Sequence, residues 1–367
     1  MRLLTEEQKH WVEVIGEFAK KEIEPIMLDW DKVTDPSKAI PFDAYAKAFK
    51  LGLNAFEIPK EYGGSKVDLA TAAVMYEEMG YYDGNFASVM QTTNLALKPV
   101  LIGGTPEQVQ YFSKHILEGK GYACFCLTEP QSGSDASNVK TTAVKDGDEW
   151  VINGEKCFIT NGNVADTFVV FAMTDKSKGT KGISAFIVES SFPGFSVGKH
   201  EEKMGLHGSP TAEIVFTDMI VPKENMLGRE GKGFNIAMQT LDGGRIGIAA
   251  QSLGIAEGAL EEAKAYTKGR VQFGKPISKF QNTQFTFADM ELGCEAGRLL
   301  TYQAAMKKGS GERYTKEAAM AKLFCSEHAM KTTTKALQMF GGYGYTKDYP
   351  MERMMRDAKI TEIYEGT

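Results

Sequence analysis

The sequence lacks the motifs that usually mark metal and nucleotide sites. It has five histidines in 367 residues, and none of them forms an HExxH or similarly tight pattern, so we predict no metal site. No GxGxxG follows an expected strand, no phosphate-binding GxxxxGK loop occurs, and Gly342-x-Gly344 has no third glycine. Any dinucleotide must therefore be held by another architecture.

Cysteine is also scarce. The five cysteines include no CxxC pair, and an odd number without a secretion signal fits a reducing cytoplasm, which is the location we expect. Cys124 and Cys126 are spaced as they would be along a strand, so we expect buried free thiols there.

Long apolar runs and a basic charge balance are missing as well. The longest apolar stretch falls far short of a membrane span, so no membrane insertion is expected. Lysine and arginine number 42 against 48 acidic residues, and this net charge of -6 argues against nucleic acid as a partner. The length suffices for two or three structural units with substantial cores.

The hydrophobic period changes twice along the chain. Residues 1–118 show helical spacing, with capping signals at Thr5 and at Thr105. Residues 119–228 contain short β-rich runs, and residues 229–367 return to long helical periods typical of a bundle. The predicted fold class is α+β, with an N-terminal helical domain, a central antiparallel β domain and a C-terminal helical bundle.

Local signals refine this division. Asp146-Gly147 and Asn153-Gly154 are both tight-hairpin signals, and we expect a compact antiparallel sandwich or barrel around them. In the last part, one helix is expected to begin at Glu317 and a further one to run from Ala329 to Phe340. No flexible linker stands out, so the parts should pack together and leave ligand sites at their boundaries.

The end of the chain places Glu365 between Tyr364 and Gly366. An aromatic neighbour can keep a carboxylate dry, and dryness raises the pKa of the carboxylate toward working pH. The glycine allows backbone and ligand to approach closely. Taken alone, however, the pattern is also typical of an ordinary turn.

Two distant segments favour a functional interpretation. The segment from Phe125 to Asp135 runs from a strand into a turn rich in hydroxyls and free backbone donors, and the segment from Trp150 to Gly162 repeats that logic. Such strand ends suit a planar heterocycle and a pyrophosphate. The alternative for each is a capped loop, because Ser, Asp and Gly are common turn residues.

These two segments resemble the flavin-contacting signatures of the acyl-CoA dehydrogenases. Further matching pieces follow in family order and at family spacing, and the resemblance runs from the first helix to the last residue. The nearest branch is the short-chain, butyryl-CoA-like one. The additional pieces are Leu241 to Ile248, Arg270 to Lys275, Gln281, Gln338 to Gly342, and Arg356 to Thr367.

The resemblance implies a C-terminal four-helix bundle and an FAD bound between the β domain and this bundle. Part of the FAD would touch a neighbouring subunit of a homotetramer. The implied FAD contacts within the subunit are Phe125, Leu127, Thr128, Phe158, Thr160 and Thr367, with Ser134 beside flavin or CoA. Those across the subunit boundary are Arg270, Gln281, Gln338 and Gly342, and the implied substrate contacts are Ser134, Asp242, Arg245 and Gly366.

The resemblance also implies α,β-dehydrogenation of an acyl-CoA thioester. Glu365 would remove the α-proton, while its backbone N–H and a ribityl hydroxyl of FAD bind the thioester oxygen. A hydride would pass from the β-carbon to flavin N5, and an electron-transferring flavoprotein would then receive the electrons.

Two features narrow the branch. Family members acting on isovaleryl-CoA and on long chains carry their base at the position of Gly244, which has no side chain here. The glutaryl-CoA branch carries an arginine in its acyl pocket, whereas the segment from Ser88 to Asn94 is neutral in this chain. The first feature favours Glu365 as the base. The second favours an acyl group without a second carboxylate.

Three alternatives stay open. The same site suits the reverse reaction, reduction of an enoyl-CoA. Gln91 and Thr92 could border a pocket for a cyclic acyl group. A non-catalytic flavin- or CoA-binding module that kept the fold is the alternative from another class. Relatives continue past Thr367 with a terminal helix that helps to grip FAD and to bury the base.

Overall fold

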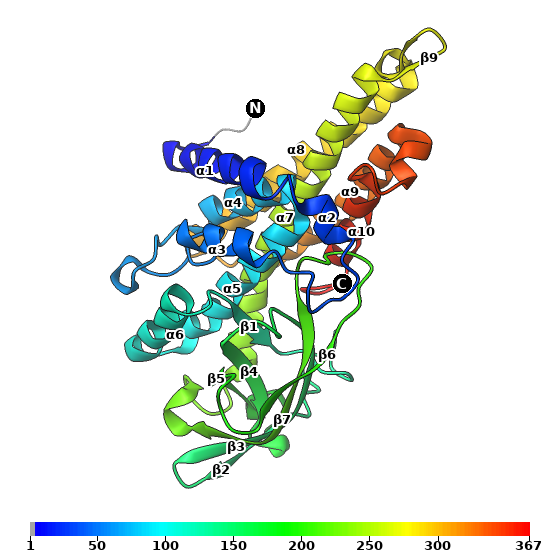
Figure 1. Ribbon diagram of the computed structural model, residues 1–367. Coiled ribbons are helices and arrows are strands. Elements are labelled where there is room, and N and C mark those ends of the chain that lie inside the picture. The colour runs from blue at the N-terminus through cyan, green and yellow to red at the C-terminus, as the bar shows by residue number, and fades with distance from the viewer. Residues whose placement is uncertain (1–3) are drawn as a thin grey trace.

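The computed structural model of the chain describes residues 4–367. Figure 1 shows a sheet at one end of the molecule, a crowded helical middle, and a long helical arm that points away from the sheet. Residues 1–3 of the predicted N-terminal domain lie outside the described residues. Helix gives way to strand between Glu118 and Ala123, and strand to helix between Leu227 and Gly233. The domain limits themselves stay a prediction.

The N-terminal part is helical, as predicted. The capping boxes at Thr5 and at Thr105 are both present, with Pro106 in the first turn of the second helix, so these two start signals are confirmed. The elements are α1 (Glu6–Glu22), α2 (Met27–Asp31), α3 (Phe42–Lys50), the short 3-10 helix η1 (Lys60–Tyr62), α4 (Leu69–Tyr82), α5 (Gly84–Gly103) and α6 (Pro106–Glu118).

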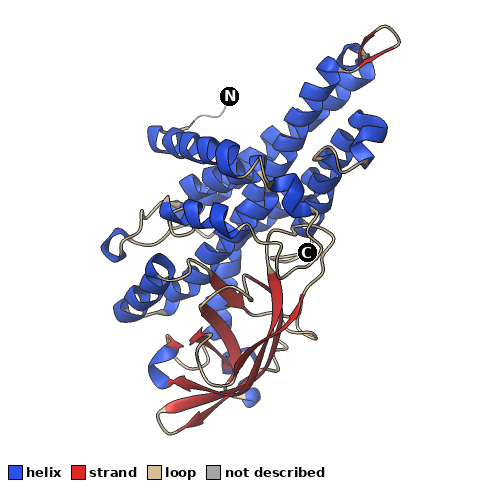
Figure 2. Cartoon of the chain, in the orientation of Figure 1, coloured by secondary structure: helices blue, strands red, loops and turns tan. Residues whose placement is uncertain are grey.

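The central part forms an eight-stranded sheet with the order β6-β7-β3-β2-β4-β5-β8, and β1 pairs with β4. Figure 2 shows its strands curling together beneath the helices. The strands are β1 (Ala123–Cys126), β2 (Thr142–Asp146), β3 (Glu149–Thr160), β4 (Thr167–Met173), β5 (Ile183–Glu189), β6 (Phe195–His200), β7 (Thr211–Pro222) and β8 (Met226–Leu227), with 3-10 helices η2 (Lys176–Gly182) and η3 (Lys223–Asn225).

Two predictions for this part were wrong in detail. The sheet is not purely antiparallel, because β1 runs parallel to β4, as does the single pairing of β2 with β4. The Asp146-Gly147 hairpin is confirmed between β2 and β3. Asn153-Gly154 makes no turn and lies inside β3, where the pairing with β7 shifts register. A Cβ at Gly154 would lie 2.6 Å from Thr141 Oγ1, so close approach of Thr141 accounts for this glycine.

The C-terminal part is built on long helices. A predicted break near residue 328 was wrong, because one helix runs continuously through Glu317, Ala329 and Phe340. The elements are α7 (Gly233–Gly269), β9 (Val271–Gln272), β10 (Lys275–Pro276), η4 (Ile277–Lys279), α8 (Gln281–Gly309), α9 (Thr315–Phe340), η5 (Gly341–Tyr345) and α10 (Met351–Thr361).

Helix α7 organises the molecule. Its 37 residues correspond to about 55 Å of helix, at a rise of about 1.5 Å per residue. It starts against Ser184 of β5, packs on α4, α5, α8 and α9, and ends at the tip of the helical arm (Figure 1). Its buried face includes Leu253, Ala256 and Leu260. The α7 helix therefore connects the sheet to the most distant part of the bundle.

All five cysteines are free and buried, which confirms the expectation for Cys124 and Cys126. Within residues 4–367, no helix has both the length and the apolar character needed to cross a bilayer.

Candidate active site

Glu365 is turned inward by an unusual backbone conformation. It follows α10 with φ of 57°, and Gly366 has φ of 100°, so two successive residues adopt the left-handed region. Glycine tolerates this conformation, whereas a glutamate rarely does, and such a local cost is typical of functional sites. The C-terminus ends between the helices and the upper edge of the sheet (Figure 1).

The carboxyl group of Glu365 lies directly on α7. A Cβ added at Gly244 would lie 2.4 Å from Glu365 Oε2 and 3.0 Å from Leu95 Cδ1 of α5. The glycine therefore leaves the space that the carboxyl group occupies. Oε2 is inaccessible to solvent and has no hydrogen-bond partner among the described residues.

Burial raises the pKa of Glu365 to about 7, although the positive charges of Lys98, Arg245 and Lys322 oppose this rise. A carboxyl group with this pKa exchanges its proton readily near neutral pH, which is what a general base needs. The predicted base therefore combines a free, buried oxygen with a suitable proton affinity.

The backbone around Glu365 is fixed by two cations. Arg245 Nε donates to the carbonyl oxygen of Glu365 at 3.3 Å, and Lys322 Nζ donates to that of Gly366 at 2.5 Å. Arg245 is itself held by Asp242 at 2.8 Å, and Asp242 accepts a hydrogen bond from Thr315 at 2.7 Å. Three of the four predicted substrate contacts, Asp242, Arg245 and Gly366, thus lie together at the end of the chain.

Tyr364 anchors the same segment from its other side. Its hydroxyl donates to Gln251 Oε1 at 2.8 Å, and Gln251 Nε2 donates to the carbonyl of Gly84 at 2.9 Å. Tyr364 therefore ties the terminus to α7 and α5.

Gln91 borders the same region. Its Nε2 reaches the carbonyl of Gly244 at 3.4 Å, and its Oε1 is buried with no hydrogen-bond partner in the described chain. A Cβ at Gly247 would lie 2.6 Å from the Gln91 amide, so α5 and α7 approach closely there. Thr92 bonds back to Ser88 within its own helix.

The two strand-end segments lie in contact with each other. The Cys157 N–H donates to the Thr128 carbonyl at 3.0 Å. Lys156 Nζ donates to the Leu127 carbonyl at 3.1 Å and to Glu129 at 2.7 Å. The ends of β1 and β3 are therefore joined by a buried side chain as well as by backbone.

Phe158 stands out in this region. It is 66% exposed and has φ of 58°, at a point where the pairing of β3 with β7 shifts register. An exposed aromatic ring on a strained backbone is available to stack on a planar ligand. Phe125 packs against Phe171, Leu127 is buried, Thr128 and Thr160 are half-buried, and Ser134 is exposed.

Hydrogen bonds connect these strand ends to the helices around Glu365. The Asn161 N–H donates to the Pro210 carbonyl at 2.8 Å, and Ser209 shares a hydrogen bond with Ser88 of α5 at 3.2 Å. Ser88 precedes Gln91 by one turn. The loop between β6 and β7 therefore links the predicted flavin segment to the helix that borders Glu365.

Four predicted FAD contacts lie elsewhere. Arg270 follows α7, Gln281 begins α8, Gln338 is near the end of α9, and Gly342 is in η5. All four are exposed, and the Arg270 guanidinium lies 5.5 Å from the centre of the Tyr343 ring. They belong to the helical arm opposite the sheet (Figure 1), so one chain does not bring them to Phe125 or Phe158. Thr367 is exposed at the terminus.

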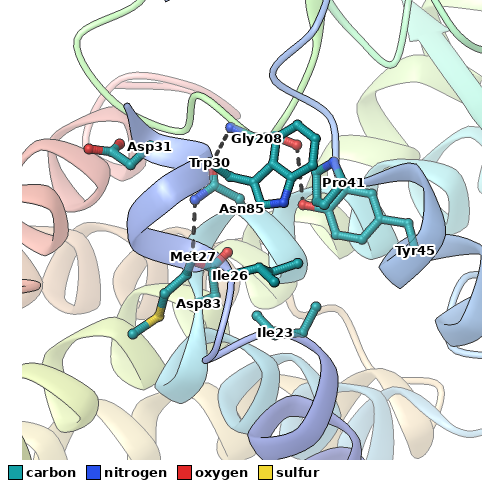
Figure 3. Close-up of a pocket in the computed structure, with 10 residues that line it drawn as sticks. All are labelled: Ile23, Ile26, Met27, Trp30, Asp31, Pro41, Tyr45, Asp83, Asn85 and Gly208. Atoms are coloured by element: carbon teal, nitrogen blue, oxygen red, sulfur yellow. Dashed lines mark hydrogen bonds between the residues drawn. The ribbon is translucent and has the colours of Figure 1, made fainter. Parts of the chain in front are cut away.

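A separate hollow lies between the N-terminal helices and the loop before β7 (Figure 3). Tyr45 and Asn85 both bond to Gly208 at its edge. None of the predicted site residues lines it. No group of three or more potential metal ligands occurs within residues 4–367.

Sequence reasoning missed three side chains of the site: Lys98, Gln251 and Lys322. Each is a buried polar residue within an apolar helical stretch. A lone lysine in such a stretch is the signal that was available, because buried lysines need a partner.

Fold and sequence assign the chain to one family. Residues 5–120, 124–219 and 231–367 match the N-terminal, middle and C-terminal domains of acyl-CoA dehydrogenase. The chain belongs to the acyl-CoA dehydrogenases, flavoprotein oxidoreductases that act on CH–CH groups.

Within the family, the chain is 52% identical to the short-chain-specific acyl-CoA dehydrogenase of Clostridium acetobutylicum, covering 99% of this chain and 95% of the relative. It is 46% identical to an acryloyl-CoA reductase (NADH) of Anaerotignum propionicum, and the match covers 99% of this chain and 92% of the relative.

Two solved structures agree with this placement. The butyryl-CoA dehydrogenase of Megasphaera elsdenii superposes with a TM-score of 0.95 at 48% identity, over 100% of this chain and 96% of the other. A chain in work on the electron transferring flavoprotein of Acidaminococcus fermentans gives 0.94 at 51% identity, with the same coverage.

Proposed function

We propose that this protein catalyses FAD-dependent α,β-dehydrogenation of a short acyl-CoA thioester, with Glu365 as the base. One observation carries the proposal: the Glu365 carboxyl group is buried against Gly244, its Oε2 has no partner within residues 4–367, and its pKa is raised to about 7 by burial. A buried group left unbonded is costly and suggests a ligand that completes it.

The residues present fit an FAD. The exposed ring of Phe158 offers a stacking surface beside the joined ends of β1 and β3. Phe125, Leu127, Thr128, Ser134 and Thr160 would hold the flavin with it. When bound, FAD supplies the acceptor for the hydride that leaves the β-carbon.

The protein's own residues then do three things. Glu365 takes the α-proton on its free oxygen. Its backbone N–H binds the thioester oxygen, and Arg245 and Lys322 fix that backbone through the neighbouring carbonyls. Leu95 and the glycine face of α7 exclude water from the carboxyl group, so its proton affinity is kept high.

Several contacts support a short acyl group. Gln91 closes the approach of α5 to α7 at Gly247, and Gln251 is bonded between Tyr364 and Gly84. The Gln91 amide thus occupies space next to the base, and a long apolar chain would have to displace it. The names of relatives, short-chain-specific and butyryl-CoA dehydrogenase, agree with this preference.

We further propose a homotetramer in which a second copy covers the outer face of α8. Phe285, Leu292, Leu299 and Met306 are spaced by seven residues and are 61%, 69%, 71% and 68% exposed. A heptad stripe of this kind matches a helix packed against another helix. The same arm carries Arg270, Gln281, Gln338 and Gly342, which would meet the FAD of the other copy.

The electron partner and the direction complete the proposal. We expect reduced flavin to pass its electrons to an electron-transferring flavoprotein, in line with the similarity to a chain from the Acidaminococcus study. The similarity to an acryloyl-CoA reductase favours one second candidate, the reverse reduction of a short enoyl-CoA. The cytoplasmic location stays a prediction.

An anaerobic titration tests the proposal. The yellow protein should bleach when butyryl-CoA is added, and the dithionite-reduced protein should regain its colour with crotonyl-CoA. Comparing the rates with an electron-transferring flavoprotein present separates the two directions. A colourless protein, or a yellow one that no acyl-CoA bleaches, would favour a non-catalytic module.

A further inference from the structure

Lys98 is an unexpected charge beside the proposed base. It belongs to α5, is only 6% exposed, and stands in the otherwise apolar run from Leu95 to Val100. Its Nζ lies 3.8 Å from the position that a Cβ would take at Gly243. Burying an ammonium group is costly, so its position calls for a reason.

The charged groups of Glu365 and Lys98 lie against two adjacent glycines of α7. Glu365 Oε2 lies on Gly244 together with Leu95, and Lys98, three residues after Leu95 on α5, lies on Gly243. Residues three apart share a helix face, so Lys98 and Leu95 both face α7. Because the region is largely buried, the field of Lys98 reaches Glu365 with little screening by water.

The charge of Lys98 is only loosely balanced. Its ion-pair partner in the described structure is Glu57, at 3.5 Å, and Glu57 also accepts the Tyr76 hydroxyl at 3.1 Å. Lys308 of α8 also approaches Gly243, and its Nζ lies 3.2 Å from the position that a Cβ would take there. Burial lowers the pKa of Lys308 to about 8, and the positive charge of Lys98 contributes to this decrease.

The remaining charges around Glu365 have other contacts. On α7, Arg245 is paired with Asp242 and bonds the terminal backbone. On α9, Lys322 bonds the Gly366 carbonyl, and burial lowers its pKa to about 8 although the charge of Glu365 opposes this. Glu362 adds a negative charge near Lys322, and the Tyr364 hydroxyl is turned to Gln251. Lys98 makes no hydrogen bond that fixes the terminal segment among the contacts described.

We propose that Lys98 is a positioning residue whose buried charge, acting across Gly243 and Gly244, favours the ionised form of the Glu365 carboxyl group, which is the form that can accept a proton. The inference rests on the proposed function of Glu365. Burial favours the protonated acid, and of the three cations that oppose it Lys98 has the largest effect. The negative charge of Glu57, paired with Lys98, weakens the effect of Lys98 on Glu365.

The competing interpretation is a structural ion pair between Lys98 and Glu57. The two interpretations predict different shifts in the pH midpoint of Glu365 for the two variants. If Lys98 acts on Glu365, Lys98→Met raises the pH midpoint of Glu365, whereas Glu57→Gln lowers it because a negative charge is lost. If the pair is only structural, both changes should destabilise the protein, and they should not shift the pH midpoint of Glu365 in opposite directions.

The test measures the midpoint directly. Infrared spectra of the flavin-loaded tetramer, recorded from pH 5 to 9 without substrate, report the protonated carboxyl band, and the Glu365→Gln protein identifies which band is Glu365. We expect Lys98→Met to raise this midpoint by about one pH unit, the usual effect of a nearby opposite charge. Lys98→Arg should restore it, and Glu57→Gln should move it down.

Substrate-driven bleaching gives a second readout. The Lys98→Met protein should bleach about tenfold more slowly below its midpoint, since about one pH unit corresponds to about tenfold in proton occupancy. It should recover at high pH. Lys308→Met serves as the comparison variant, because Lys308 lies on the same glycine but is not among the three cations that oppose the rise in the pKa of Glu365.

Two results would overturn the inference: an unchanged infrared midpoint in Lys98→Met, or shifts of one sign in Lys98→Met and Glu57→Gln. If Lys98→Met does not fold, the downward shift in Glu57→Gln decides alone. Opposed infrared shifts in a protein that no acyl-CoA bleaches would support the inference and reject the proposed function.

Discussion

Two glutamates of this protein have buried carboxyl oxygens close to lysines and nevertheless have opposite properties. Glu129 accepts hydrogen bonds from Lys156, from the backbone of Lys140 and Thr141, and from Gln131. Burial alone would raise the pKa of Glu129, but the charge of Lys156 and these hydrogen bonds hold it below its usual range.

Glu365 shows the reverse. Its Oε2 has no hydrogen bond within residues 4–367, and burial raises its pKa to about 7. The comparison shows that burial alone does not make a carboxyl group reactive. The charge of a close cation together with hydrogen bonds to the charged form decides whether the carboxyl group is a fixed anion or a group ready to exchange a proton.

Among the changes that test this comparison of the two glutamates, removing the base should have the largest effect. Glu365→Gln keeps the shape of the side chain but cannot accept the α-proton, so bleaching by acyl-CoA should slow by about 10²–10⁴-fold. The protein should stay yellow. Stopped-flow absorbance at matched flavin content measures the rate, and near-normal bleaching would reject Glu365 as the base.

Removing the partner of the fixed anion should act on the fold instead. Lys156→Met leaves the Glu129 charge buried and unpaired, with an expected loss of about 3–5 kcal/mol of stability. It also frees the Leu127 carbonyl, so flavin content should fall. Urea unfolding and flavin absorbance measure both effects. Adding Glu129→Gln should return part of the stability, and no such recovery would contradict the pairing.

The raised pKa of Glu365 should appear as a stability cost that depends on pH. The folded state keeps its proton up to about pH 7, whereas the usual value is 4.5, so unfolding releases a proton between these values. Stability therefore falls as pH rises through this window, by up to about 3 kcal/mol.

Glu365→Gln removes that slope. Melting of the two proteins should coincide near the acid end of the window and diverge above it, with the variant more stable near neutral pH. Parallel stability curves across the window would show that the carboxyl group is not held protonated.

Filling the space below the base should misplace it. A Cβ at Gly244 would lie 2.4 Å from Glu365 Oε2, so Gly244→Ala should push the carboxyl group away and slow bleaching by about 10²-fold. Gly269→Ala is the matched control on the same helix, because nothing lies within 4 Å of its Cβ position. Equal rates in both variants would contradict the close contact.

The smallest effect is expected far from both glutamates. Arg270→Ala removes a cation at the arm and should weaken tetramer and flavin retention together, by about tenfold in apparent affinity at most, as for an exposed charge. Gel filtration with absorbance at two wavelengths measures both quantities. Unchanged flavin content in an intact tetramer would count against a contact across subunits.

The sequence predicted what depends on local chemistry. Thr5 and Thr105 start helices because their side chains bond backbone groups three residues on. Asp146-Gly147 turns the chain because the glycine accepts φ of 58°. Asn153-Gly154 looks alike but is bonded to Asp218 and packed on Thr141, and these contacts come from remote strands.

The sequence did not reveal which remote residues surround Glu365. Its dryness was expected from Tyr364, whereas the close approach of its carboxyl group to Gly244 is made with a distant helix. Lys98 escaped notice because its neighbours in sequence are apolar and its significance depends on which glycine it faces. Properties set by helix–helix contact cannot be read from spacing within one segment.

The single uninterrupted α7 has a consequence for how the assembly would work. One rod carries Asp242, Gly244 and Arg245 near one end and meets Arg270 at the other. If the arm reaches a second copy, each chain contributes to two catalytic centres. Mixed oligomers of a Glu365→Gln chain with an Arg270→Ala chain would then hold one centre with both defects and one with neither, so the intact centre would restore the activity that the Glu365→Gln oligomer lacks.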